Sequence, residues 1–182
     1  MNYDFMTPEE ALAAQKALKH MTKFEKLVII NIAPRMGKSE FSSYLFPAYF
    51  LGNYPEKKII MGTHTASLSE DFGRRVRNLI ESEEYQEIFP NTVVADDQKA
   101  AGKWSTGAGG QYYAAGVGGA LAGRGADLFV IDDPHSEQDM KANSRLAFDN
   151  AWSWFQTGPL QRLMAGGAII VIMTRWSLLD LT

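Results

Sequence analysis

Four short apolar runs, rich in valine and isoleucine, constrain the fold of this chain more than any other feature. They occupy residues 27–32, 58–61, 128–131 and 168–173. Apolar runs of this length, bounded by turn signals, predict buried strands. Because stretches of helical character separate the strands, we expect them to pair in parallel. The sequence therefore predicts an α/β fold in which helices flank a mostly parallel central sheet.

The stretches between the runs contain three candidate helices. The first covers residues 38–46, and Pro47 is expected to kink or end it, because proline lacks the N–H group that a helix interior needs. The second opens with a capping box at residues 67–70, and the third covers residues 144–155. Their apolar faces predict these buried residues: Phe72, Val76, Leu79 and Ile80 in the second helix, and Leu146, Phe148, Trp152 and Phe155 in the third.

A glycine-rich segment interrupts this alternation of strands and helices. Residues 102–126 hold nine of the 16 glycines in the chain. Composition alone favours a flexible loop. However, residues 111–115 have the character of a strand, so a small hairpin followed by a glycine-rich approach to the next core strand fits the segment better.

Length and composition limit the class of protein. A chain of 182 residues is expected to form one domain, or one domain and a fragment, with a buried core. The absence of cysteine excludes disulfides, cysteine-ligated zinc and thiol nucleophiles. No apolar run approaches the roughly 20 residues of a membrane span, and residues 1–26 lack the apolar core of a signal peptide, so the cytoplasm is the default location. The net charge of −3 predicts that any basic nucleic-acid surface is local, or lies on another domain or subunit.

The segment between the first predicted strand and the first predicted helix has the pattern of a phosphate-binding loop. The candidate loop residues are Pro34, Arg35, Met36, Gly37, Lys38 and Ser39. Backbone N–H groups at a helix N-terminus bind anions, Lys38 would contact the β and γ phosphates, and the Ser39 hydroxyl would bind Mg²⁺. The pattern is incomplete, because its usual first glycine is Ile32 here and Pro34 contributes no N–H donor. The alternative is an ordinary strand-to-helix turn capped by Ser39.

Two adjacent carboxylates, Asp132 and Asp133, follow the third apolar run. Acids at the end of a buried strand are costly without a cation or a partner, and a bound Mg²⁺ would compensate them. Asp132 would bind the metal and Asp133 would polarise the attacking water, a position at which many ATPases carry the longer Glu. The alternative is that the pair caps the turn that precedes Pro134. The phosphate-loop pattern upstream favours the catalytic interpretation.

Thr174 follows the fourth apolar run and is predicted to lie beside the γ-phosphate. In the ASCE class of phosphate-loop ATPases, an extra strand lies between the loop strand and the acidic strand, and it ends in such a polar residue. Ligands bind at the carboxyl ends of parallel strands. Phosphoryl transfer also needs a positive group near the developing charge. Arg35 in the loop and Arg124 ahead of the acidic strand are the candidates.

Other polar residues receive structural interpretations. Arg74, Arg75 and Arg77 are expected to form a solvated, salt-paired helix face. The histidines have no metal-ligand spacing; they are His20, His64 and His135. A nuclease metal cluster of Asp132, Asp133, His135 and Asp139 is disfavoured, because the nucleotide site already accounts for two of its acids.

Together these motifs resemble the ATPase domain of the large terminase subunit, the DNA-packaging motor of tailed bacteriophages. The resemblance runs from about Lys26 to Asp180. Residues 34–39 are similar to the family's Walker A loop, residues 123–134 to its Walker B region, and residues 174–176 to its coupling motif. The resemblance implies a phosphate-loop NTPase of the ASCE type that uses ATP and Mg²⁺.

The resemblance also implies roles for individual residues. The implied roles are ATP and Mg²⁺ binding for Lys38 and Ser39, Mg²⁺ binding for Asp132, activation of water for Asp133, and coupling of hydrolysis to movement for Thr174. Arg124 matches the region that supplies a trans-acting arginine in some members. The adenine-contacting glutamine that normally precedes the loop would be Gln15, which is the only glutamine there.

At the level of the whole protein, the resemblance implies ATP-driven translocation of double-stranded DNA into a procapsid. The expected partners are the portal protein, the small terminase subunit and further copies of the chain in a ring, usually a pentamer. The expected location is the host cytoplasm and, transiently, the procapsid portal, and no membrane is involved. The family continues beyond the length of this chain into the rest of the ATPase domain and a nuclease domain. We therefore expect residues 1–182 to form a partial ATPase domain with weak hydrolysis and no nuclease activity. The rival functions are a non-hydrolysing, nucleotide-gated assembly module and another ASCE motor such as a helicase.

Overall fold

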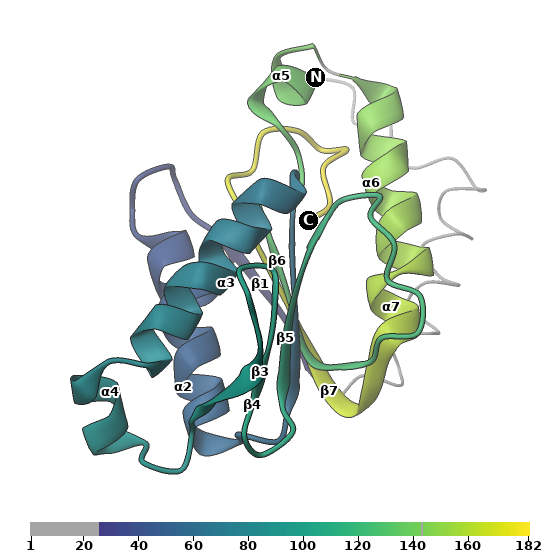
Figure 1. The fold of residues 1–182 in the computed structure, drawn as a ribbon. Helices are drawn as coiled ribbons and strands as arrows, with labels where there is room; N and C mark the ends of the chain where they lie inside the picture. The colour runs from purple at the N-terminus through teal and green to yellow at the C-terminus, as the bar shows by residue number, and fades with distance from the viewer. Residues whose placement is uncertain (1–25, 143) are drawn as a thin grey trace.

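The computed structural model describes residues 26–142 and 144–182, in which a seven-stranded sheet lies between helical layers (Figure 1). The strands are β1 (Lys26–Asn31), β2 (Lys58–Thr63), β3 (Val94–Ala100), β4 (Lys103–Thr106), β5 (Gln111–Gly116), β6 (Ala126–Asp132) and β7 (Leu163–Met173). The helical segments are the π-helix η1 (Glu40–Leu45), α2 (Phe46–Asn53), α3 (Ala66–Ile80), α4 (Glu83–Ile88), α5 (Glu137–Lys141), α6 (Arg145–Thr157) and α7 (Pro159–Arg162).

The sheet has the strand order β1-β7-β6-β2-β5-β4-β3. The first five strands in this order are parallel, and β3 and β4 are antiparallel additions at one side. In the pairing register Asn31 lies opposite Met173, and Asp132 lies opposite both Ile172 and Thr63. The carboxyl ends of β1, β7, β6 and β2 therefore meet at one edge of the sheet.

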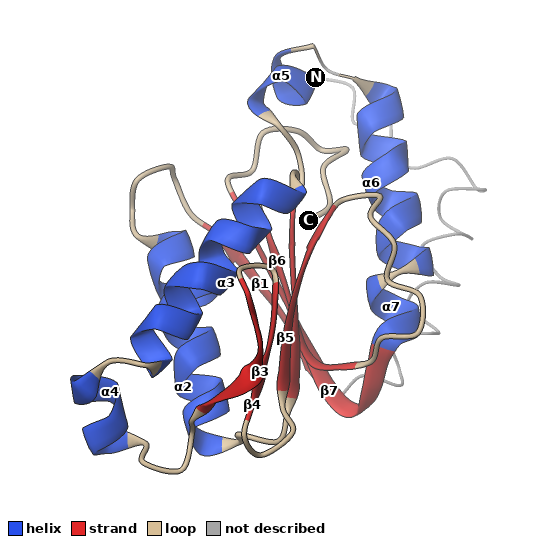
Figure 2. Ribbon diagram, viewed as in Figure 1, coloured by secondary structure: helices blue, strands red, loops and turns tan. Residues whose placement is uncertain are grey.

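Two apolar cores lie on the two faces of the sheet (Figure 2). On one face, Leu51 of α2 and Phe72, Val76 and Ile80 of α3 pack against alternate residues of the strands. On the other face, Trp154 and Phe155 of α6 and Leu160 of α7 cover the remaining alternate residues. The strands are apolar on both faces because helices cover both, which is the pattern expected of a parallel sheet.

All four apolar runs form strands, and the predicted hairpin is present as β4 and β5. The prediction that every run is buried was wrong for β1, in which Val28 and Ile29 are 45% and 49% exposed. Among the described strands β1 pairs only with β7, so one of its sides has no strand neighbour. A β-branched run predicts a strand, but the strand order decides how much of it is covered.

Two helix boundaries differ from the prediction. Pro47 does not end its helix, which continues through α2 to Asn53. The proline lies where the wider π-helical turn of η1 meets α2, and such a turn accommodates both its ring and its missing N–H group. The second predicted helix begins earlier than expected, because the Thr65 hydroxyl caps α3 by accepting a hydrogen bond from the N–H group of Leu68.

The face that α6 buries also differs from the prediction. Phe148 and Phe155 are buried as expected, but Leu146 and Trp152 are 70% and 36% exposed. Trp154 is buried in their place. The helix is apolar on more than one side, so its sequence leaves open which side faces the sheet.

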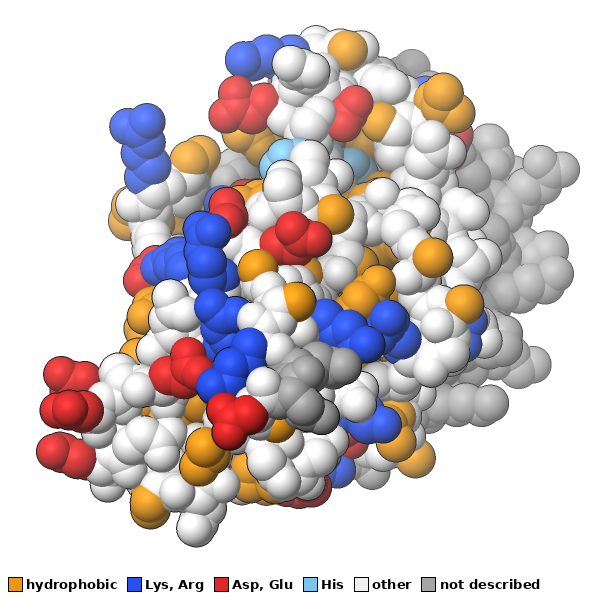
Figure 3. All heavy atoms as spheres, viewed as in Figure 1, with side chains coloured by type: hydrophobic (Ala, Val, Ile, Leu, Met, Phe, Trp, Pro, Cys, Tyr) orange, Lys and Arg blue, Asp and Glu red, His pale blue; other side chains and the backbone are white. Residues whose placement is uncertain are grey.

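The arginines of α3 form the salt-paired face that the sequence predicts. Arg74 pairs with Asp71, Arg75 with Glu40, and Arg77 with Glu81. Figure 3 shows Lys and Arg side chains beside acidic ones on this side of the molecule. Within the described residues, no helix is long and apolar enough to cross a membrane.

Candidate nucleotide and metal site

The sheet edge at the carboxyl ends of β1, β6 and β7 holds the three motifs that the sequence singled out. β7 lies between β1 and β6, which is the strand placement predicted for the strand that precedes Thr174. The candidate phosphate loop follows β1, the two acids lie at the end of β6, and Thr174 follows β7. The Thr174 hydroxyl donates to the carbonyl of Ile32 at 3.2 Å, which joins two of these segments directly.

The loop after β1 is exposed and has an unusual backbone. Arg35 and Gly37 have φ angles of 62° and 79°, in the left-handed region that favours glycine. A Cβ atom on Gly37 would meet nothing within 4 Å, so the glycine is needed for its backbone conformation and not for space. The N–H group of Phe41 donates to the Gly37 carbonyl at 3.0 Å as the helix begins. Left-handed residues that alternate with right-handed ones turn successive N–H groups toward one side, which is how backbone nests bind anions.

Lys38 connects the loop to the other two motifs. Its side chain is only 9% exposed, and its amine lies 3.1 Å from Asp133 Oδ2. The same amine donates to the Thr174 hydroxyl at 3.3 Å. Lys38 thus directly contacts Asp133, which follows β6, and Thr174, which follows β7.

Asp132 is 2% exposed, and its two carboxylate oxygens have different surroundings. The hydroxyl of Ser43, a fully buried residue of η1, donates to Oδ2 at 2.7 Å. Within the described part of the chain, Oδ1 is buried and accepts no hydrogen bond. Burial raises the pKa of Asp132 above its usual value, although the hydroxyls of Ser43 and Ser39 oppose that increase.

These surroundings fit a divalent cation. A buried carboxylate oxygen without a partner is costly, and a cation that it could ligate would remove the cost. The Ser39 hydroxyl lowers the pKa of Asp132, which indicates that the two side chains lie near each other. No group of three or more His, Asp or Glu residues within the described segments could hold a metal. A Mg²⁺ held by Asp132 and Ser39 would therefore need its remaining ligands from a bound phosphate and water.

Asp133 has a strained backbone that its neighbours hold in place. Its φ angle is 42°, which is uncommon for a residue other than glycine. Its N–H group donates to the carbonyl of Ile172 at 2.8 Å, and its Oδ1 accepts from the N–H group of Thr174 at 3.3 Å. The backbone N–H group and the ring Nδ1 of His64 each lie 3.3 Å from the Asp133 carbonyl. These contacts hold the carboxylate over the loop, where it meets Lys38.

The structure places the two candidate arginines differently. Arg35 lies in the exposed loop itself. Arg124 precedes β6 at the amino end of that strand, and its guanidinium stacks on the ring of Tyr113 at 3.6 Å. Tyr113 belongs to β5, which three strands separate from β1. The fold therefore does not bring Arg124 to Lys38 within one chain, and a role in a neighbouring subunit stays a prediction.

Sequence reasoning missed two residues of this site. Ser43 lies four residues after Ser39, the candidate metal ligand. Residues at this spacing share one face of a helix, so the spacing could have indicated that Ser43 also faces the site. His64 was considered only as a metal ligand, but it directly follows β2, whose last residue pairs with Asp132 at this sheet edge. Gln15, the predicted adenine contact, lies outside the described residues.

Three comparisons relate the chain to known proteins. Residues 29–157 match the family described as terminase large subunit, T4likevirus-type, N-terminal. The crystal structure of the large terminase of bacteriophage HK97 is similar in fold, with a TM-score of 0.53 and 13% sequence identity. That similarity covers 94% of this chain and 34% of the HK97 chain, so the chain spans about a third of the length of that protein. A comparison with curated protein sequences finds no significant match.

Proposed function

The chain belongs to the terminase large subunit family, and from that premise we propose that it is an ATPase of the ASCE type that drives DNA packaging. The observation that carries the proposal is the contact of the Lys38 amine with both Asp133 and Thr174. A buried lysine that follows an exposed, left-handed backbone loop suits a triphosphate. One carboxylate and a hydroxyl contact that lysine, and a second carboxylate, Asp132, directly precedes the first, an arrangement that suits phosphoryl transfer to water.

The proposed division of labour follows from these contacts. The N–H groups of residues 35–39 and the amine of Lys38 bind the phosphates of ATP, while Ser39 and Asp132 hold Mg²⁺. A Mg²⁺ held by Ser39 and Asp132 would supply positive charge to offset the charge on the phosphates. Asp133 orients the attacking water.

Lys38 has to change partners for this reaction to proceed. The Lys38 amine is paired with Asp133 in the structure, and a bound triphosphate would compete for the same amine. When the phosphates take the lysine, the Asp133 carboxylate is freed to accept a hydrogen bond from water. Thr174 senses the same exchange, because its hydroxyl accepts from Lys38 and its N–H group donates to Asp133. We propose this exchange as the step that couples ATP binding to movement through Thr174.

At the level of the whole protein, the proposed activity is translocation of double-stranded viral DNA into a procapsid. The proposed partners are the DNA, the portal protein, the small terminase subunit and further copies of the chain in a ring. Arg124 would then act on the site of a neighbouring copy, and Arg35 within its own. Because a trans-acting arginine contributes about 10³–10⁵ in rate, the isolated chain should hydrolyse ATP slowly.

A steady-state phosphate-release assay tests the ATPase proposal. Lys38→Ala and Asp133→Ala should each reduce release to the level without protein, while binding of a fluorescent ATP analogue is lost only in Lys38→Ala. Lys141→Ala, which changes an exposed lysine of α5, is the matched control and should behave as the wild type.

The outcomes also separate the rival functions. If the wild type and both site variants release phosphate equally while the wild type still binds nucleotide, the chain is a non-hydrolysing assembly module and not an ATPase. Separation of DNA strands that depends on ATP would point instead to a helicase.

A further inference from the structure

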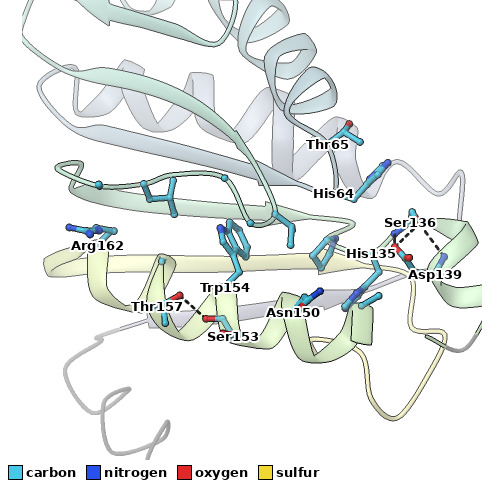
Figure 4. Close-up of a pocket in the computed structure, with 18 residues that line it drawn as sticks. His64, Thr65, His135, Ser136, Asp139, Asn150, Ser153, Trp154, Thr157 and Arg162 are labelled. Carbon is cyan, nitrogen blue, oxygen red and sulfur yellow. Dashed lines mark hydrogen bonds between the residues drawn. The ribbon is translucent and has the colours of Figure 1, made fainter. Parts of the chain in front are cut away.

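A hollow lies on the opposite face of the sheet from η1 and α3, against α6 (Figure 4). It is a cleft of about 780 Å³ between α6, the glycine-rich loop after β5 and the segment that follows β6. Figure 4 shows Arg162 at one end of the cleft and Ser136 with Asp139 at the other, with Trp154 and Asn150 between them. Neither the phosphate-loop residues nor the two acids line it.

The topology of the sheet accounts for the position of this cleft. β2 and β6 are neighbours in the sheet, but the chain leaves them toward opposite faces. After β2 it enters α3, which packs on one core, and after β6 it reaches α6, which packs on the other. Adjacent parallel strands whose connections diverge leave a crevice at their carboxyl ends, and such crevices are the usual ligand sites of open α/β sheets. His64 and Pro134, which follow these two strands, line the cleft.

One end of the cleft has polar groups without partners. Trp154 is 6% exposed, and its indole N–H group is buried and makes no hydrogen bond to any described residue. Arg162 is half-buried, its Nε atom is likewise buried without a partner, and it forms no ion pair with the described residues. Buried donors are almost always paired in folded proteins. Both atoms have almost no accessible surface in this structure, so a ligand in the cleft would supply the missing acceptor by drawing the Trp154 and Arg162 side chains toward it.

The other end of the cleft is already satisfied. The Nε2 atom of His135 accepts a hydrogen bond from the N–H group of Leu181 at 3.2 Å. The carboxylate of Asp139 accepts from the hydroxyl of Ser136 in the capping box of α5. A ligand is therefore needed at the end formed by Trp154 and Arg162, where every unpaired group is a donor and one carries a positive charge.

We propose that this cleft binds a small anionic molecule, a phosphate or carboxylate attached to a hydroxyl-bearing body. The anionic group would pair with the Arg162 guanidinium, whose planar donors suit a phosphate or carboxylate. The indole N–H group of Trp154 would donate to the same ligand once the ring turns toward the cleft. Asn150 and the hydroxyls of Ser153 and Thr157 on α6 line the remainder of the cleft and suit a polyol. The volume lies within the range of small-molecule sites and is too small for a DNA duplex.

NMR of the indole N–H signals tests the proposal and resolves the site. The chain has four tryptophans, and Trp154→Phe identifies the signal of Trp154 by its loss. Glycerol 3-phosphate added to the whole chain should shift that signal saturably, whereas glycerol, its uncharged match, should not. Arg162→Gln should weaken the binding at least about tenfold, because a charge-assisted hydrogen bond is lost.

Two control variants make the proposal falsifiable. Arg74→Gln, which changes an arginine outside the cleft, should leave the shift of the Trp154 signal unchanged. Lys38→Ala, which weakens phosphate binding at the loop after β1, should also leave it unchanged, because the shift arises in the cleft. A shift that disappears in Lys38→Ala would assign the probe to the phosphate loop and overturn the proposal. The proposal would be overturned if neither glycerol 3-phosphate nor inorganic phosphate shifts the Trp154 signal. It would also be overturned if only a 20-base-pair DNA duplex shifts that signal. Binding that is unaffected by Arg162→Gln would also refute it.

Discussion

Replacing Ser43 with alanine should destabilise the protein through Asp132. The Ser43 hydroxyl donates a hydrogen bond of 2.7 Å to this buried carboxylate. Among the described residues it is the one donor whose distance to the carboxylate is that of a normal hydrogen bond. A hydrogen bond to a charged group contributes about 1.5–3 kcal/mol. The variant removes this bond from Oδ2, while Oδ1 already lacks a partner among the described residues. We therefore expect the free energy of unfolding to fall by about 2 kcal/mol at pH 8. For a chain of this size, that loss lowers the melting temperature by about 4–8 °C.

The loss should depend on pH with a defined sign. Burial raises the pKa of Asp132 and the Ser43 hydroxyl lowers it, so the variant has a still higher folded-state pKa than the wild type. At pH values above that pKa the carboxylate is ionised and the full loss applies. As the pH falls through the pKa, the carboxyl becomes protonated, and the loss should shrink toward the roughly 1 kcal/mol of a neutral hydrogen bond.

Urea denaturation followed by circular dichroism at pH 8 and pH 5 measures both effects. Ser42→Ala is the matched control, because Ser42 is a neighbouring buried serine of η1 that makes no hydrogen bond to Asp132. At pH 8, Ser42→Ala should lower the free energy of unfolding less than Ser43→Ala does, and the difference should be about the strength of the hydrogen bond to the charged carboxylate. Equal losses in the two variants, or a loss in Ser43→Ala that grows as the pH falls, would refute this account of Asp132.

Two further predictions concern other buried groups. The raised pKa of Asp132 means that the wild-type protein loses stability as the pH rises and this carboxyl ionises, and Asp132→Asn should abolish that loss. In the wild type, ADP with Mg²⁺ should raise the melting temperature more than ADP with EDTA does. Asp132→Asn should remove this difference. Tyr112→Phe should leave stability unchanged or increase it, because the Tyr112 hydroxyl is buried without a partner in the described structure. Tyr85→Phe should instead cost about 1 kcal/mol in urea denaturation, because its hydroxyl donates to the Ala48 carbonyl at 2.8 Å. Equal effects of the two tyrosine variants would contradict this distinction.

The candidate nucleotide site was largely predictable because its parts are local in sequence. Each part is a polar residue directly after an apolar strand, and parallel strands bring their carboxyl ends to one edge. Lys38, Asp133 and Thr174 could therefore be expected to meet before any geometry was known, and their contacts bear out this placement. Their chemical roles stay predictions until the variants are assayed.

The supporting residues were less predictable. Ser43 looks like any small residue of a helix, and its significance depends on a carboxylate 89 positions later in the chain. His64 matters through its contact with the carbonyl of Asp133, and no motif in the sequence marks a backbone contact. The cleft beside α6 depends on the directions in which the chain leaves β2 and β6, which is a property of strand order.

The sequence alone determined the strands formed by the four apolar runs, the α/β class and the chemical groups at the ends of those strands, because these follow from local hydrophobicity and from residue type. It gave no signal for β3. Only the tertiary structure decided which strand lies uncovered, which side of α6 faces the sheet, and how Pro47 is accommodated within a helix. It also decided that Arg124 lies away from Lys38, since strand order places β5 at a distance that sequence separation does not encode. The physical reason is that packing chooses among arrangements of nearly equal local preference, and that choice is made by contacts between residues distant in the chain.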